Sequence, residues 1–180
     1  MLGGRYSFAE GGYGGTPVAE ALPVVMNPPI PDPHDVFTEV SVRPTVSGLG
    51  HVAAQIRSDG ESGPAVWDSL PPLSIMNPIF QVKPGATALL TGEAPGGEQI
   101  VLAYQRYGRG KSVALPVTDT WIWQMHADIP LEDQTHETFW KQLLRWLLDG
   151  VPDHVDASIA AEEAEVGETV RVLADVRDSA

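Results

Sequence analysis

The chain has 180 residues, 43% of them hydrophobic, and its 24 acidic and 11 basic side chains give a formal charge of −13 at pH 7. This acidic balance argues against a nucleic-acid partner, because contacts to phosphates need a surface rich in Lys and Arg. The absence of cysteine excludes disulfides, thiolate nucleophiles and thiolate metal sites.

The first part of the chain is rich in glycine, with six glycines among residues 3–15. Thr16 and Pro17 follow as a helix start, so a short helix is predicted over residues 17–22. A glycine-rich loop can bind an anion on its backbone N–H groups, but no Lys follows at the spacing of a P-loop. We therefore interpret these glycines as a tight connection between elements.

A proline-rich segment runs from Pro23 to Pro44, and a strand is predicted over residues 36–42. Asp32, His34 and Asp35 cluster in its loop. Ordered metal ligands need a rigid frame, which this loop lacks. We predict a solvated loop there, and neither a metal site nor a cofactor in the chain.

The next segments predict short elements around a central strand. Residues 44–50 predict a turn, and residues 51–56 fit either a strand or a helical turn. Residues 65–70 predict one helical turn with Trp67 in the core. Residues 86–91, ATALLT, predict a central strand.

The clearest elements follow in the second half of the chain. Residues 100–107 and 111–117 form a predicted hairpin, since Gly108 and Gly110 permit a tight turn between them. Apolar side chains at i, i+4 spacing predict a helix over residues 133–148 with a broad buried face.

Polar residues and two tryptophans follow the second hairpin strand: Thr118, Asp119, Thr120, Trp121 and Trp123. In open α/β sheets ligands bind beyond the carboxyl ends of the strands, so we expect a site here. Asp119 is the first candidate for a functional carboxylate, and the alternative is that it caps the following turn. Core packing is expected for both tryptophans, although an exposed indole would offer a binding platform.

Two histidines and a serine complete the candidate residues. His126 and His136 could each approach Asp119, as in a hydrolase. Ser7 lies in the glycine-rich opening, but its spacing does not match a nucleophile elbow. No HExxH pattern or other metal-ligand spacing occurs.

Four stretches in this order resemble the glutamine amidotransferase-like domain, a class I amidotransferase relative with a flavodoxin-like fold. They are LGGRYSFAEGGYGGTPVAEALPV, KPGATALL, YGRGKSVALPVTDTWIW and HETFWKQLLRWLL. The resemblance covers residues 1–151 and implies an α/β fold: a partial, mostly parallel sheet with a β-hairpin and a long C-terminal helix. It also implies that the N-terminal β-α units are missing and that Met1 is an internal start.

The resemblance places a pocket at the strand ends. Class I amidotransferases carry a nucleophilic Cys where this chain has Gly3 and Gly4, so glutamine hydrolysis through a thioester is excluded. The implied ligand-binding residues are Gly3, Gly4, Ser7, Phe8, Thr118, Asp119, Thr120 and Trp121.

The pattern of residues along the chain changes after Pro152. Residues 169–176 alternate as a strand with one wet face, and residues 155–159 precede them. The segment 152–180 resembles the start of an immunoglobulin-like β-sandwich, which often follows the amidotransferase-like domain.

The sequence therefore predicts a non-catalytic amidotransferase-like domain with a binding or assembly role in a larger bacterial envelope protein. The resemblance implies a membrane-anchored parent, although this chain has no signal peptide and no run near the roughly 20 apolar residues of a membrane span. Expected partners are other domains of the parent or another protein, and self-association through an open sheet edge is also expected. Alternatives are a hydrolase using Asp119 with His126 or His136, and a carbohydrate-binding surface built on Trp121 or Trp123.

Overall fold

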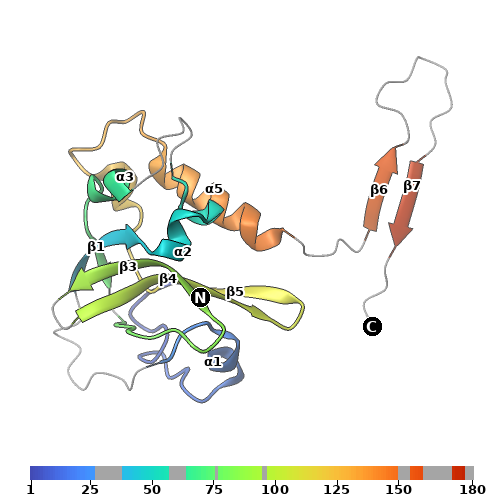
Figure 1. Cartoon of the computed structure of the whole chain (residues 1–180), viewed down its shortest axis with the longest axis horizontal. Coiled ribbons are helices and arrows are strands. Elements are labelled where there is room, and N and C mark those ends of the chain that lie inside the picture. Colours follow the sequence, from blue (N-terminus) through green and yellow to red (C-terminus); the bar gives the residue numbers. More distant parts are fainter. Residues whose placement is uncertain are drawn as a thin grey trace. The chain divides into compact units, whose positions relative to one another are not determined.

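A five-stranded antiparallel sheet lies at the centre of the computed structural model (Figure 1). The structure describes residues 1–26, 38–56, 64–75, 77–94 and 97–149, and the backbone of residues 155–159 and 172–176. The chain divides into two compact units, Met1–Asp149 and Gly150–Ala180. All the candidate site residues belong to the first unit.

The strands of the first unit follow the order β2-β1-β3-β4-β5. Every neighbouring pair in this sheet is antiparallel. The predicted hairpin is confirmed, with Tyr107 opposite Gly110 and Gly108 at a positive φ of 58° in the turn. The strands are β1 (Thr38–Pro44), β2 (Leu73–Ile75), β3 (Thr87–Ala94), β4 (Gly97–Tyr107) and β5 (Gly110–Ala114).

This sheet shows that the expected mostly parallel, flavodoxin-like fold is wrong, and with it the resemblance to the glutamine amidotransferase-like domain. Parallel neighbours need a long crossover, usually a helix. Here only two residues separate β3 from β4 and two separate β4 from β5, which is too short for a crossover, and both pairs are antiparallel. Among the described residues, parallel pairing is limited to the single bridge between Leu2 and Leu115.

Short helices surround the sheet, and one long helix follows it. The predicted N-cap is confirmed, because the Thr16 hydroxyl accepts a hydrogen bond from the Ala19 N–H. Residues 44–50 contain a one-turn helix rather than a simple turn, capped by the side chain of Thr45. The helices are α1 (Pro17–Ala21), α2 (Val46–Leu49), the 3₁₀ turn η2 (Val52–Ala54), α3 (Pro64–Asp68), α4 (Ile122–Met125) and α5 (Thr135–Leu148).

Apolar clusters cover both faces of the sheet. Val113 belongs to the cluster that includes Phe139 and Leu143 of α5, whereas its neighbour Ala114 belongs to the cluster that includes Phe8. Successive side chains of a strand point to opposite faces, so the two clusters lie on opposite sides. Figure 1 shows α1 on one side of β4 and β5 and α5 on the other.

The chain leaving β5 joins the two edges of the sheet. Leu115 forms the parallel bridge to Leu2, and Val117 forms an antiparallel bridge to Ile75 in β2. Because β2 and β5 are the opposite edge strands, residues 115–118 connect them and the sheet is strongly curled. This connection positions the candidate site.

The second unit consists of one described strand pair. β6 (Val155–Ile159) and β7 (Val172–Val176) run antiparallel, with Val155 opposite Val176. The immunoglobulin-like sandwich stays a prediction.

Candidate functional site

Three segments that are distant in the sequence meet at the end of β5. The Gly3 N–H donates to the Leu115 carbonyl at 2.6 Å. The Asn77 side-chain amide donates to the Gly4 carbonyl at 2.8 Å and lies 3.3 Å from the Ser7 hydroxyl. The structure therefore brings together the N-terminal turn, the loop after β2 and the residues after β5.

Gly3 lies closest to the neighbouring backbone where these three segments meet. A Cβ atom at Gly3 would lie 2.2 Å from the Pro116 carbonyl oxygen and 2.5 Å from that of Val117. Only a residue without a side chain fits against this backbone. At Gly4, by contrast, a Cβ atom would meet nothing within 4 Å.

Ser7 and Phe8 form a strained turn. Phe8 has a φ of 51°, the only positive φ outside glycine in the described chain, and its ring is buried. The Ser7 hydroxyl donates to the Gly4 carbonyl at 2.7 Å. Neither Asp119 nor a histidine contacts this hydroxyl in the described residues, so the turn holds structure rather than an activated nucleophile.

Asp119 is buried and holds β2. Its Oδ1 accepts a hydrogen bond from the Ser74 N–H at 2.8 Å, while the Thr118 N–H donates to the Ser74 carbonyl at 3.1 Å. The carboxylate thus extends the pairing between the residues after β5 and the edge strand. The sequence offered a cap of the following turn as the alternative to a functional carboxylate, but this hydrogen bond goes to the edge strand β2 instead.

His136 contacts Thr120 rather than Asp119. Trp140 donates its indole N–H to His136 Nε2 at 3.1 Å and lies 3.3 Å from the Thr120 hydroxyl. That hydroxyl lies 3.4 Å from the same ring nitrogen. Burial lowers the pKa of His136, which favours the neutral ring that accepts from Trp140.

His126 lies apart from these groups. Its Nδ1 lies 3.6 Å from the Asp128 carboxylate, and both side chains are exposed. Within the described residues neither His126 nor His136 forms a hydrogen bond or ion pair with Asp119. Among the described residues, the structure therefore pairs neither histidine with Asp119.

The two tryptophans differ, and the expectation of core packing for both is wrong. Trp123 is 1% exposed and packs edge-on against Trp67 and Phe139. Trp121 is 53% exposed. Trp121 directly precedes the single helical turn α4. Residues two apart in a helical turn do not face the same side, so Trp121 points away from the side on which Trp123 is buried.

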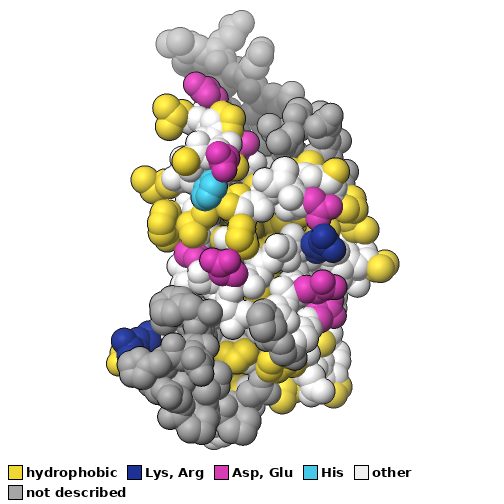
Figure 2. Space-filling view, turned by 90° about the vertical axis from the view of Figure 1, so that its left-hand side faces the viewer, with side chains coloured by type: hydrophobic (Ala, Val, Ile, Leu, Met, Phe, Trp, Pro, Cys, Tyr) yellow, Lys and Arg dark blue, Asp and Glu magenta, His cyan; other side chains and the backbone are white. Residues whose placement is uncertain are grey.

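Trp121 belongs to an exposed surface whose other apolar residues sequence reasoning missed. Met125 and Leu131 are 75% and 93% exposed, and Asp128 and Glu132, which are close to them in the sequence, are exposed as well. We call these five residues the Trp121 surface. Figure 2 shows one face of the molecule on which hydrophobic and acidic side chains intermingle and few basic ones appear. A helical pattern over residues 121–125 would have placed Trp121 and Met125 together.

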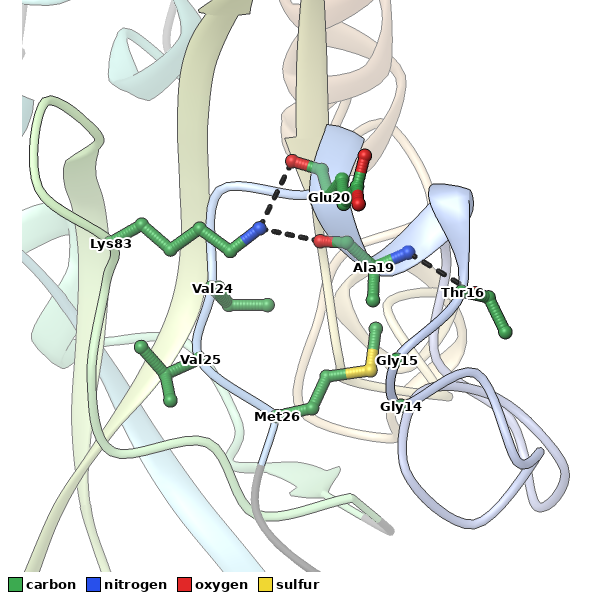
Figure 3. A pocket seen from close by; sticks show the side chains of 9 residues that line it. All are labelled: Gly14, Gly15, Thr16, Ala19, Glu20, Val24, Val25, Met26 and Lys83. Atoms are coloured by element: carbon green, nitrogen blue, oxygen red, sulfur yellow. Dashed lines mark hydrogen bonds between the residues drawn. The ribbon is translucent and has the colours of Figure 1, made fainter.

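An open pocket of about 300 Å³ lies beside α1 (Figure 3). The glycines of the N-terminal loop line it together with Lys83. The Lys83 ammonium donates to the carbonyls of Ala19 and Glu20, so it satisfies the end of α1. With Glu20 also in the lining, the pocket lacks a free positive group for a phosphate.

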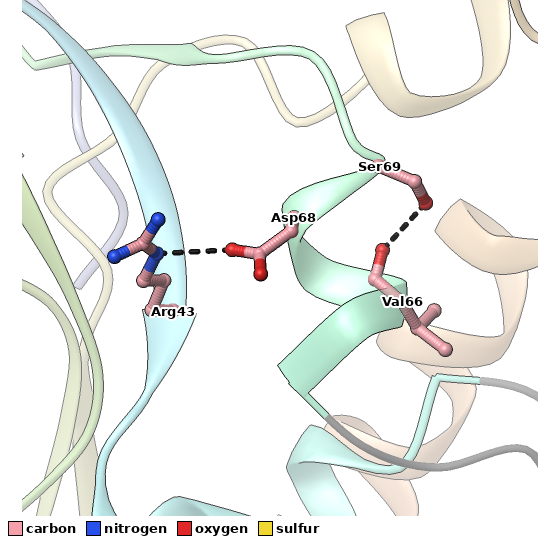
Figure 4. Close-up of polar contacts among 4 residues, drawn as sticks. All are labelled: Arg43, Val66, Asp68 and Ser69. Carbon is pink, nitrogen blue, oxygen red and sulfur yellow. Dashed lines mark hydrogen bonds and ion pairs between the residues drawn. The ribbon is translucent and has the colours of Figure 1, made fainter.

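An ion pair on the surface joins β1 to α3. Arg43 of β1 pairs with Asp68 of α3 at 3.0 Å on the surface (Figure 4). No group of three or more His, Asp or Glu side chains that could hold a metal ion occurs in the part of the chain that the structure describes. The Asp32, His34 and Asp35 cluster lies outside it.

The fold and site define a curled antiparallel sheet whose edges are joined through a polar strand-end cluster. The chain matches no protein-family model and no curated protein sequence. Two solved structures from Salmonella typhimurium are similar. Cytoplasmic Protein STM1381 of strain LT2 shares 23% identity with a TM-score of 0.53, over 82% of this chain and 54% of its own. Cytoplasmic Protein STM3548 shares 20% identity with a TM-score of 0.55, over 82% and 53%.

At these identities the likeness concerns the fold alone, and the chain spans about half the length of each neighbour. Helices of the described residues are all too short or too polar to cross a bilayer.

Proposed function

We propose that Met1–Asp149 is an interaction domain that binds another protein through the Trp121 surface. The observation that carries this proposal is the contrast within one short segment. Asp119 is buried and bound to the Ser74 N–H, whereas Trp121, two residues later, is half exposed. The strand-end cluster then acts as the support for a binding surface.

The residues on either side of Trp121 are held by contacts to the core, which favours binding. Thr120 contacts His136 and Trp140 of α5, and Trp123 is anchored in the core. Trp121 lies between these two anchored residues, so little side-chain or loop ordering is needed when a partner binds. Tryptophan is also among the residues that contribute most to protein interfaces.

The alternatives receive less support. A hydrolase that uses Asp119 with His126 or His136 needs contacts that are absent among the described residues. A carbohydrate platform could use the exposed indole of Trp121 with the carboxylates of Asp128 and Glu132 as acceptors. The exposed apolar side chains of Met125 and Leu131 favour a protein partner over a sugar. Both neighbours are named cytoplasmic proteins, which favours a cytoplasmic partner over the envelope setting suggested by the sequence.

In-cell photocrosslinking tests the proposal. A photoreactive amino acid replaces Met125 in the full chain, and a matched chain carries it at Leu144, an exposed apolar residue of α5. We expect one discrete adduct from position 125 that is absent from position 144 and disappears when Trp121→Ala is added. Equal adducts from both positions, or none, would contradict the proposal.

An esterase assay addresses the hydrolase alternative. Purified full chain and Asp119→Asn are compared on p-nitrophenyl esters. Hydrolysis by the wild type that is lost in a folded Asp119→Asn variant would support the enzyme rather than the interaction domain.

A further inference from the structure

The segment that carries the Trp121 surface has acidic side chains and no Lys or Arg. Residues 112–140 contain no Lys or Arg. Asp128 and Glu132 belong to the surface, and Glu137 on α5 is also exposed. The side chain of Asp128 is 90% exposed. A partner that approaches this segment therefore meets acidic groups and no basic group from the segment itself.

The apolar groups have the spacing of a helix. The Met125 N–H donates to the Trp121 carbonyl at 3.1 Å, so the two side chains lie one turn apart on the same side of α4. Methionine adapts its shape to different partners, and tryptophan supplies a large rigid contact. Together they present an apolar strip with carboxylates next to it in the sequence.

We infer that the partner docks as a cationic amphipathic helix, an inference that rests on the proposed function. Its apolar stripe packs on Trp121 and Met125, and its Lys or Arg side chains face Asp128 and Glu132. The charge complementarity decides for this class over an acidic or neutral helix, which would leave these carboxylates unpaired or repelled.

A direct binding experiment uses a synthetic helix about 18 residues long, which is long enough to form. Leu occupies one face and Lys the other, and a fluorescent label reports binding to the full chain by anisotropy. Two matched peptides serve as controls: one has Glu in place of Lys, and one has Ser in place of Leu.

Variants of the protein show whether the peptide contacts the Trp121 surface or is only attracted by the negative charge of the whole protein. Trp121→Ala keeps the net charge and is expected to weaken binding by about 10-fold or more. Leu144→Ala, at similar exposure, should bind as the wild type does. The double variant D128N/E132Q should weaken binding and reduce its salt dependence, since screening acts on these charges.

Three results would overturn the inference. The first is that the Leu/Lys peptide binds the wild type and Trp121→Ala equally. The others are that the wild type binds the Ser/Lys peptide as tightly as the Leu/Lys peptide, or binds the Glu peptide more tightly than the Lys peptide. Sedimentation that shows a dimer lost in Trp121→Ala would assign the surface to a second copy instead. If Trp121-dependent crosslinking occurs while the cationic helix fails to bind, only the partner class is wrong. If both fail, the interaction domain itself is wrong.

Discussion

The Ser74 N–H donates to Asp119 Oδ1 at 2.8 Å, which joins residues 45 positions apart in the sequence. Ser74 belongs to the edge strand β2, and Asp119 follows the chain that leaves the opposite edge strand. A single carboxylate therefore reinforces the connection between the two edges of the sheet.

Removal of this carboxylate should destabilise the fold. Asp119→Ala leaves the Ser74 N–H without its acceptor in a partly buried place, which costs about 1–3 kcal/mol of unfolding free energy. Asp119→Asn keeps a carbonyl oxygen that can accept, so its loss should be smaller. Urea denaturation measures both, with the exposed Asp128→Ala as the control. Equal stability of Asp119→Ala and Asp128→Ala would show that the bond does not hold the edges.

Two neighbouring glycines provide a matched pair of substitutions. Gly3→Ala forces a Cβ atom against two backbone oxygens, whereas Gly4→Ala meets open space. We expect Gly3→Ala to lose about 1–3 kcal/mol or more, as overpacked sites do, and Gly4→Ala to stay near the wild type. Thermal unfolding followed by circular dichroism gives the comparison. Two variants with equal melting temperatures would refute the close approach of residues 3 and 116–117.

Local signals in the sequence identified elements correctly where a few residues decide the geometry. Gly108 specifies the hairpin turn, and Thr16 with Pro17 specifies the start of α1. The i, i+4 pattern of Phe139 and Leu143 identified α5, whose buried side chains include both. Each signal depends on neighbours within one or two turns.

Strand direction was wrong for a physical reason. A continuous apolar run is typical of a parallel strand covered on both faces. Residues 113–117 have that run because clusters on both sides of this antiparallel sheet cover them. A strand that is buried on both faces can belong to a parallel or an antiparallel sheet, so the apolar run alone does not predict the direction of pairing.

The candidate site was found in part. Asp119 follows the chain that leaves β5, and its partner Ser74 is 45 positions away in the sequence. His136 reaches Thr120 across 16 positions, and no local pattern specifies such a contact. The helical turn α4 lacks a side-chain N-cap, so no capping residue in the sequence marked the start of this helix.

The two tryptophans should respond oppositely to truncation. Trp123→Ala removes a buried ring and the hydrogen bond from its indole N–H to the Pro71 carbonyl, and it should cost about 3–5 kcal/mol. Trp121→Ala removes a half-exposed ring and should stay within about 1 kcal/mol of the wild type. Denaturant midpoints measure both. A Trp121→Ala variant that unfolds as easily as Trp123→Ala would show that Trp121 serves the core, and it would remove the basis of the binding surface.

Lowered histidine pKa values should make the fold sensitive to mild acid. Burial lowers the pKa of His136, and burial together with Lys111 lowers that of His51. His51 packs against Tyr104 and Trp146, and its Nδ1 accepts from the Ala53 N–H. Both neutral rings are therefore favoured in the folded chain.

The direction of the pH dependence follows from proton binding. Below the unfolded pKa of about 6.5 the unfolded chain binds more protons than the folded one. The contribution of each ring is present in full above that pH and is lost as the pH falls toward the lowered folded pKa. Urea denaturation across this range should show stability falling in the wild type and a shallower fall in the double variant H51Q/H136Q. Parallel profiles for the two proteins would mean that neither ring is held neutral by folding.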